Sequence, residues 1–432
     1  MATDALTLLP GPGTRVLLRR EQWLLDRDGF LAQARAMARS WPEGRYVINL
    51  CDDRGHFLLG FTSALLAGRT TLLPQARTPR VLREIAQRHA PATVIDDDWM
   101  EERLQLQEPD AGEEAVPQPM PGQAVAIGFT SGSTGEPKAS AKTWANFLGS
   151  TQRNLEVLRR YAPVGTILAT VPTQHMYGIE TCVLLPLLGP YAVACERPMF
   201  PQDLAASLAR LPQPVVLVTT PVHLRSFVDA GLVYRPPAVI ISATAPLTRD
   251  LAIAAEDTFG APLLEVFGSA ETCIIAHRRT ARDERWTLYP GLGLQPVAEG
   301  TQVHAPYLDG PVLLHDHVEI SGERSFQVRG RAQDMVEIGG KRCTLGEITT
   351  RLLAIPGVKD SAVLQAIESG PLGVQRIIAF VVAPGVDDAA ILAALRESLD
   401  PVFLPRKLVR LEKLPRNETG KLQRSALLDL LH

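Results

Sequence analysis

Short apolar runs alternate with amphipathic segments along the first part of the chain. The pattern predicts strands at 46–50, 70–73 and 92–95 and helices at 57–67 and 80–89. Gly68 follows the first of these helices and is a good stop signal for it. The order strand, helix, strand, helix, strand is typical of a sheet that carries helices on its faces.

The same alternation continues beyond residue 160, where the expected strands are almost entirely apolar. Strands of this kind are found where both faces of a parallel sheet are covered. The pattern predicts strands at 166–171, 214–219, 238–241 and 262–267 and helices at 204–211 and 248–258.

After Gly300 the apolar runs become short and are separated by turns, which predicts a smaller antiparallel or barrel-like sheet. From Gly346 the pattern predicts a compact α+β unit with helices at 347–353 and 388–399 and strands at 362–366 and 377–382. We therefore expect an α/β protein. Its large N-terminal domain, residues 1–332, would hold mostly parallel sheets flanked by helices plus the small barrel-like sheet. A small α+β C-terminal domain would follow over residues 333–432.

Composition narrows the class of partner. The 432 residues are 46% hydrophobic and 21% charged, so large buried cores can form. With 44 Lys+Arg against 47 Asp+Glu the net charge is -3, which gives no support for a nucleic-acid partner. The five cysteines are scattered, and no pair has C-x-x-C spacing. This pattern favours a reducing compartment and argues against a structural zinc site. The apolar stretch 182–195 is broken by proline and glycine, and no signal peptide precedes it, so we expect a cytoplasmic protein without membrane insertion.

A loop rich in glycine and hydroxyl groups follows the apolar run 124–128. Glycines allow several backbone N–H groups to converge on one anion, while hydroxyls and a lysine add donors and charge. The segment 129–138, FTSGSTGEPK, therefore predicts a phosphate cradle for a nucleotide, although it lacks the Gly-Lys-Ser/Thr order of a P-loop. The residues expected to contribute are Ser131, Gly132, Ser133, Thr134, Gly135 and Lys138.

A lone carboxylate follows another expected strand. Glu271, after the run Phe267-Gly268-Ser269-Ala270, suits a Mg²⁺ ligand, because magnesium takes one or two carboxylates together with phosphate oxygens. An acid in the first turn of a helix is an equally good interpretation of Glu271 alone. Ala243, Thr244 and Ala245 are small residues at the end of strand 238–241, where open α/β sheets bind ligands, and an ordinary strand–helix turn is the alternative.

Three further charged residues lie nearer the C-terminus. Asp316 is suited to accept hydrogen bonds from ribose hydroxyls, and Arg331 to hold the same sugar or a phosphate, although both residue types are common on solvated faces. Lys421 lies in a Thr-Gly-Lys turn, from which a lysine can stabilise charge that develops on a phosphate or carboxylate. A solvent-exposed basic tail is the alternative for Lys421.

These clusters, in this order, resemble the adenylate-forming superfamily, which includes acyl-CoA synthetases, aryl-acid ligases, luciferases and peptide-synthetase adenylation domains. The loop 129–138 is close to the superfamily's signature loop. GRAQDMVEIGGKRCTLGEI (330–348) resembles its hinge and the following loop, and LPRNETGKLQR (414–424) resembles its C-terminal catalytic segment. The compact format is most similar to the standalone hydroxybenzoate–acyl carrier protein ligases of aryl-polyene pigment clusters.

The resemblance implies a two-step reaction. A carboxylate attacks the α-phosphorus of ATP to give an acyl-adenylate and pyrophosphate, and a pantetheine thiol then displaces AMP. It implies that Glu271 holds Mg²⁺, that Asp316 and Arg331 hold the ribose, and that Lys421 bridges the substrate carboxylate and the α-phosphate. The C-terminal domain is expected to be mobile and to rotate between the two steps. By the same resemblance, Ala243, Thr244 and Ala245 line the adenine slot and Phe267 stacks on adenine, while Gly268 and Ser269 also belong to the cofactor site. Thr130 and His175 are expected among the catalytic residues, Gln333 at the hinge and Gly340 in the thiolation loop.

Two positions depart from the superfamily's pattern. Gln333 replaces the usual Asp or Lys after the hinge arginine, and we expect the hinge to survive because backbone rotation needs no charge. Ala270 removes a hydroxyl that the superfamily offers to phosphate, which we expect to weaken ATP binding modestly.

The acid is predicted from the residues expected to line the acyl pocket. The thiol acceptor is predicted from the compact format and from basic surface residues. His175 either contacts a carboxylate, gates the pocket or packs as an ordinary histidine. Hydroxyls of Tyr177, Thr219 and Thr220, near Gly178, are expected to meet a substrate hydroxyl, which favours a small aromatic acid such as hydroxybenzoate. Acyl carrier protein is the expected acceptor, with free CoA as the alternative. An amine acceptor and a non-catalytic binding protein remain further alternatives. The basic residues expected to meet an acidic carrier helix are Arg342, Arg351, Arg406, Lys407, Arg410 and Lys413.

Overall fold

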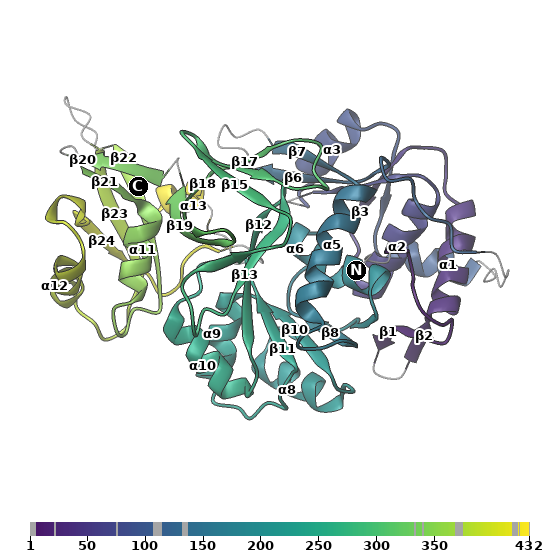
Figure 1. Ribbon diagram of the computed structural model, residues 1–432, viewed down its shortest axis with the longest axis horizontal. Coiled ribbons are helices and arrows are strands. Elements are labelled where there is room, and N and C mark those ends of the chain that lie inside the picture. Colours follow the sequence, from purple (N-terminus) through teal and green to yellow (C-terminus); the bar gives the residue numbers. More distant parts are fainter. Residues whose placement is uncertain are drawn as a thin grey trace. The chain divides into compact units, whose positions relative to one another are not determined.

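The computed structural model describes residues 6–20, 23–74, 77–106, 115–131, 137–331, 334–338, 341–367, 375–416, 422 and 424–431 (Figure 1). The chain forms two compact units. The first comprises residues 1–243, 254–277 and 306–309, and the second comprises residues 244–253, 278–305 and 310–432. Helix α10 (Arg249–Phe259) contributes residues to both units.

One sheet of the first unit has the strand order β5-β3-β4-β6-β7. Its first four strands are parallel, and the last is antiparallel because it follows β6 through a hairpin. The strands are β3 (Tyr46–Asn49), β4 (Thr70–Leu73), β5 (Ala92–Ile95), β6 (Ala124–Ser131) and β7 (Pro137–Thr143). Helices α3 (Pro79–Arg88) and α4 (Asp97–Leu106) connect or follow these strands.

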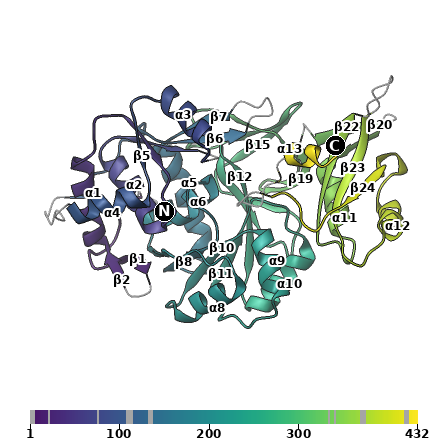
Figure 2. The same cartoon turned by 180° about the vertical axis from the view of Figure 1, so that it is seen from behind.

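The second sheet of this unit has the strand order β13-β12-β11-β10-β8-β9-β1-β2. Strands β12, β11, β10, β8, β9 and β1 run parallel, so their carboxyl ends meet at one edge. The strands are β1 (Val16–Arg20), β2 (Trp23–Asp26), β8 (Gly165–Ala169), β9 (Tyr191–Ala194), β10 (Val215–Thr219), β11 (Val239–Ser242), β12 (Leu263–Ser269) and β13 (Cys273–Arg278). Figure 2 shows α8 (Pro201–Arg210) beside β10 and β11.

Helix α2 (Arg54–Leu66) is buried on every side, as expected of a helix that is apolar all round. Along its length it contacts β3 and β4, whereas Arg54 at its start donates to carbonyls at the ends of β8 and β9. The helix therefore lies between the two sheets. Other helices of the unit are α1 (Arg27–Arg39), α5 (Trp144–Leu158), α6 (Met176–Gly178), α7 (Leu185–Leu188) and α9 (Pro221–Asp229), with a π-helix at Ile179–Leu184.

The second unit begins with antiparallel strands. Strand β16 pairs with β15 and β17, and β18 lies against β15 and β16, which gives the expected barrel-like group. Strand β19 pairs with both β18 and β14. The strands are β14 (Trp286–Leu288), β15 (Gly293–Val297), β16 (Gly300–His304), β17 (Val312–Leu314), β18 (Asp316–Gly322) and β19 (Ser325–Arg331).

The α+β part of this unit has cores on both faces of one small sheet. Side chains alternate along β22, so that Val363 packs with α11 and α12 while Ala362 and Leu364 pack with Leu427 of α13. The elements are the hairpin β20 (Met335–Ile338) and β21 (Lys341–Thr344), then α11 (Leu345–Leu353), β22 (Asp360–Ile367), β23 (Gln375–Val382), α12 (Asp388–Ser398), β24 (Lys407–Arg410) and α13 (Arg424–Asp429).

The α/β fold class predicted from the sequence is confirmed. All five cysteines are buried and unpaired with one another. Burial raises the pKa of Cys195 to about 11 and that of Cys343 to about 12, and it raises the pKa of Cys51, Cys182 and Cys273 as well. Among the described residues, no helix combines the length and apolarity required to cross a bilayer.

Candidate active site

The predicted phosphate loop joins β6 to β7. The antiparallel register pairs Thr130 with Lys138 and Ser131 with Pro137, which places these backbones at the mouth of a hairpin. Strand β6 is also a parallel strand of the sheet. The loop therefore begins at the carboxyl edge of the sheet, where α/β proteins bind ligands. Gly132, Ser133, Thr134 and Gly135 lie outside the described residues.

Glu271 lies in a tight turn between β12 and β13. The Ser269 amide donates to Thr272 Oγ1 at 3.0 Å, and the amides of Glu271 and Thr272 both donate to Ser269 Oγ at 3.2 Å. Cys273, with φ of 62°, adopts a left-handed conformation that is uncommon for a residue with a side chain. A Cβ at Gly268 would lie 2.0 Å from the Cys273 carbonyl oxygen, so this position requires glycine.

The Glu271 carboxylate fits a magnesium ion. The residue is partly exposed, and its carboxylate forms no hydrogen bond or ion pair with the described part of the chain. A single carboxylate of this kind is the protein ligand that Mg²⁺ uses beside phosphates. The interpretation of Glu271 as a first-turn helix acid is wrong, because β13 and not a helix follows.

Further predicted residues lie at one edge of the large sheet. The register pairs Thr219 with Ser242, and Ser242 with Glu265, so the chain leaves β10, β11 and β12 at a common edge. Ala243 directly follows β11, and Phe267 lies near the end of β12. Thr244, with φ of 82°, and Ala245 come next along the chain.

The hydroxyls expected to meet a substrate are already engaged with protein atoms. Tyr177 Oη donates to the main-chain oxygens of Thr219, at 3.2 Å, and Ile241, at 3.0 Å. Thr219 Oγ1 lies 2.9 Å from Thr170 Oγ1, and Thr220 Oγ1 accepts from the His223 amide at the start of α9. Each of these hydroxyls therefore already has a protein partner, and a contact with a substrate hydroxyl stays a prediction.

Thr170 and His223 extend this polar cluster. His223 Nδ1 lies 2.7 Å from Thr170 Oγ1. Burial, with the positive charge of Arg197 as a second cause, lowers the pKa of His223 to about 4, so its ring is neutral at pH 7. Thr170 was not predicted from the sequence, because it carries no motif. The buried Ser242 Oγ has no hydrogen-bond partner among the described residues.

His175 and Gly178 flank the short helix α6. The His175 carbonyl accepts from the Ile179 amide at 2.8 Å, which starts the helical segment. A Cβ at Gly178 would lie 2.0 Å from the Pro172 carbonyl oxygen, so only glycine allows this close approach. His175 is half-buried.

The second unit brings the two predicted ribose residues together. Asp316 and Arg331 face each other across the β18–β19 hairpin, and the Asp316 carbonyl accepts from Thr301 Oγ1 at 2.7 Å. Gly330, the residue before Arg331, has φ of 112°, and a Cβ at this position would lie 2.4 Å from Thr344 Oγ1. Thr344 also donates to the Arg329 carbonyl and caps α11 by accepting from the Glu347 amide. Gln333 and Gly340 lie outside the described residues.

The segment that resembles the C-terminal catalytic segment, residues 414–424, is held at Arg416. Arg416 forms a two-point ion pair with Asp360, at 2.8 Å and 2.7 Å, and it bridges to Leu422 in antiparallel fashion. Lys421 itself lies outside the described residues.

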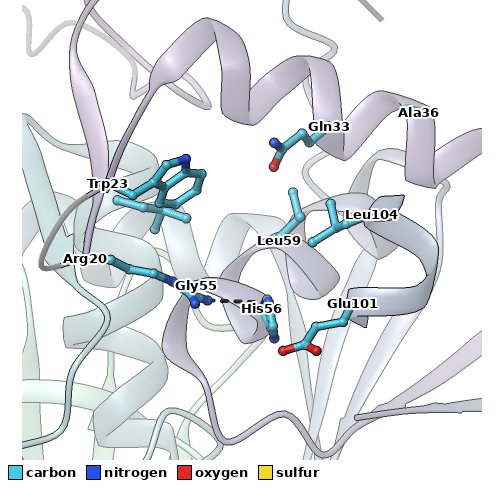
Figure 3. A pocket seen from close by; sticks show the side chains of 10 residues that line it. Arg20, Trp23, Gln33, Ala36, Gly55, His56, Leu59, Glu101 and Leu104 are labelled. Carbon is cyan, nitrogen blue, oxygen red and sulfur yellow. Dashed lines mark hydrogen bonds between the residues drawn. The ribbon is translucent and has the colours of Figure 1, made fainter. Parts of the chain in front are cut away.

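A separate cavity of about 410 Å³ lies between the β1–β2 hairpin and helices α1, α2 and α4. Figure 3 shows Trp23, Leu59 and Leu104 around it, with Arg20 pointing at His56. Arg20 pairs with Asp53 at 2.7 Å, and His56 Nδ1 lies 3.0 Å from Asp97 Oδ1, so these polar groups satisfy one another. None of the residues predicted from the sequence lines this cavity.

Comparison with known families settles the relationship of the chain. The AMP-binding enzyme family matches residues 42–305, and the AMP-binding enzyme C-terminal domain family matches residues 347–421. The chain belongs to the AMP-binding enzyme family. This membership confirms the predicted adenylate-forming superfamily.

Individual relatives agree with this membership. A 4-coumarate–CoA ligase of Rhodobacter capsulatus is 30% identical over 69% of this chain and 74% of its own length. A p-hydroxybenzoic acid–AMP ligase of Mycobacterium tuberculosis is 26% identical over 78% of this chain and 54% of its own length. The ATP-bound structure of MatB from Rhodopseudomonas palustris has the same fold, with a TM-score of 0.84, 19% identity and coverage of 97% of this chain and 96% of that one.

Proposed function

We propose that this protein is an ATP-dependent acid–thiol ligase, which activates a carboxylic acid as an acyl-adenylate and transfers the acyl group to a pantetheine thiol. The observation that carries the proposal is the turn of Glu271. This family member has a carboxylate, without a partner among the residues that the structure describes, in a turn that is hydrogen-bonded to β7, the strand that leaves the phosphate loop.

In the first step the substrate carboxylate forms a bond to the α-phosphorus of ATP, the bond to the β-phosphate oxygen breaks, and pyrophosphate leaves. Glu271 would hold a Mg²⁺ ion, which when bound neutralises phosphate charge. Backbone N–H groups of the 131–138 loop would orient the β- and γ-phosphates, and Asp316 and Arg331 the ribose. Lys421 would stabilise the charge that develops between carboxylate and phosphate.

In the second step the thiol sulfur attacks the acyl carbon, the acyl–phosphate bond breaks, and AMP leaves with the electron pair. The thiol proton passes to water. We propose that residues 333–432 form the domain that rotates about Gln333 between the steps, bringing the loop at Gly340 to the site in place of Lys421.

A small aromatic acid such as a hydroxybenzoate is the acid we favour. The relative named for p-hydroxybenzoic acid supports this class, and so does the relative named for 4-coumarate. Near the expected acyl pocket, Tyr177, Thr170 and His223 combine an aromatic ring with neutral polar groups, a composition that supports a phenolic ring over a long alkyl chain.

Acyl carrier protein is the acceptor we favour, and free CoA is the second candidate, favoured by the relatives named as CoA ligases. Two of the basic residues expected to meet a carrier, Arg351 and Arg410, pair with Glu347 and Asp388, so their charge is partly neutralised. The reaction would take place in the cytoplasm, in keeping with five unpaired cysteines.

ATP–pyrophosphate exchange with a panel of acids tests the proposal. Exchange that depends on Mg²⁺ and on one aromatic acid is expected, and absence of exchange with every acid would reject the proposed ligase. Thioester formation with carrier-bound pantetheine and with free CoA then separates the two acceptors. Equal or faster turnover with CoA would remove the carrier protein from the proposal.

A further inference from the structure

A buried carboxylate lies beside the Glu271 turn. Glu180, in the π-helix, is 1% exposed, and its carboxylate accepts from Ser150 Oγ at 2.5 Å and Asn154 Nδ2 at 3.3 Å. It also accepts from the Ile274 amide, at 3.0 Å and 3.1 Å for its two oxygens. Ile274 follows the strained residue Cys273, so Glu180 holds the exit of the turn.

A buried lysine holds the centre of the same turn. Lys142, on β7, is 2% exposed, and its Nζ donates to the Glu271 carbonyl. Burial raises the pKa of the Glu180 carboxyl, while the hydrogen bonds from Ser150 and Ile274 and the positive charge of Lys142 act in the opposite direction.

Donors from outside the turn meet three successive carbonyls. Ser140 Oγ lies 3.4 Å from the Ala270 oxygen, Lys142 reaches the Glu271 oxygen, and Tyr307 Oη lies 3.2 Å from the Thr272 oxygen. Ser140 and Lys142 are two residues apart on β7 and so point to one face of the strand. Together with Glu180 they over-determine the turn, which is what allows a left-handed Cys273 to persist.

We propose that Lys142 and Glu180 are positioning residues, which lock the Glu271 carboxylate in a fixed place relative to the phosphate loop. The strand that carries Lys142 is the continuation of that loop, so one hairpin sets both the phosphate ligands and the direction of Glu271. The role in catalysis depends on the proposed function, in which Glu271 holds Mg²⁺.

Two variants and a matched control test this inference. Lys142→Met removes the donor, and Glu180→Gln removes the charge. Thr151→Val alters a buried hydroxyl of α5 that has no hydrogen-bond partner among the described residues, next to Ser150, which does contact Glu180. Where Lys142→Met does not fold, Ser150→Ala removes one hydrogen bond from Glu180 and serves instead.

The first readout is hydrogen exchange of the backbone over residues 267–274, without ATP or Mg²⁺. Both variants should exchange at least tenfold faster there, and Thr151→Val should match the wild type. The second readout is the Mg²⁺ concentration that gives half-maximal ATP–pyrophosphate exchange. It should rise at least tenfold in Lys142→Met, while the rate at saturating Mg²⁺ stays within about threefold of wild type.

Unchanged hydrogen exchange over 267–274 in folded Lys142→Met would overturn the positioning role. A lower rate at every Mg²⁺ concentration, without a shift in the half-maximal concentration, would also overturn it. Failure of the proposed function has a different signature, because the wild type would then exchange no pyrophosphate with any acid. Hydrogen exchange would still decide whether Lys142 and Glu180 hold the turn.

Discussion

Arg416 offers the sharpest test of how the catalytic segment is held. Arg416 and Asp360 form a two-point ion pair, with 13% and 28% of the side chains exposed, and Arg416 also bridges to Leu422, the residue after Lys421 in the sequence. Arg416→Ala removes the ion pair and frees the base of that segment. The expected effect is on the position of Lys421 and not on the bound nucleotide.

The size of the effect follows from the geometry of the pair. Hydrogen bonds to charged groups contribute about 1.5–3 kcal/mol when buried, and partial exposure reduces this pair to about 1–2 kcal/mol. If that free energy holds the segment in place, the rate of adenylate formation should fall by about 5- to 30-fold. Thioester formation from preformed acyl-adenylate should stay near the wild-type rate, because Lys421 acts in the first step.

ATP–pyrophosphate exchange measures the first step, and product formation from synthetic acyl-adenylate measures the second. Arg210→Ala is the control, because Arg210 forms an ion pair with Glu196, 2.9 Å long, at a place to which no role in the reaction is assigned. Equal losses in Arg416→Ala and Arg210→Ala, or equal losses in both steps, would refute the reasoning.

Three further outcomes are expected. Lys421→Ala should lower ATP–pyrophosphate exchange at least about a hundredfold while sparing thioester formation from preformed adenylate; unchanged exchange would remove Lys421 from the site. The pKa of His223 in the folded protein is about 4, below the usual 6.5, so the unfolded chain binds more protons between these pH values. The free energy of unfolding should therefore fall by up to about 3 kcal/mol as the pH drops from 6.5 to 4. Chemical denaturation of His223→Gln should show a weaker pH dependence than wild type. Gly268→Ala should destabilise by about 1–3 kcal/mol and impair adenylate formation, whereas Gly293→Ala, with its nearest contact at 3.8 Å, should not.

The sequence pattern predicted the parallel strands well because burial on both faces leaves continuous apolar runs. The expected strands at 70–73 and 214–219 match β4 and β10, in which every residue is buried. Helix α5 escaped prediction because its capping box uses Asn146 in place of the usual Glu or Gln three residues after Thr143. The β1–β2 hairpin was not predicted, because its two strands are short, carry charged residues at their ends and show no alternation of apolar and polar residues.

At the candidate site, sequence motifs predicted the residues proposed to contact substrates. The residues that support them could be identified only from the packing in the structure. Glu271 and Asp316 follow recognisable turns, so their neighbourhoods could be predicted. Lys142 and Glu180 carry no motif, and a single polar residue in an apolar stretch does not reveal its partner far along the chain. The engagement of the Tyr177 hydroxyl with main-chain oxygens likewise depends on strand register, which sequence alone leaves open.

The state of the cysteines has a chemical consequence for a protein that makes an activated acyl group. An acyl-adenylate can acylate an accessible thiolate, and one cysteine, Cys273, lies two positions after Glu271. Burial raises the pKa of the Cys273 thiol, so the thiol is almost entirely protonated at pH 7, and its side chain is out of reach of reagents. The enzyme would thus be shielded from acylating itself, leaving the incoming pantetheine as the sulfur nucleophile that its intermediate encounters.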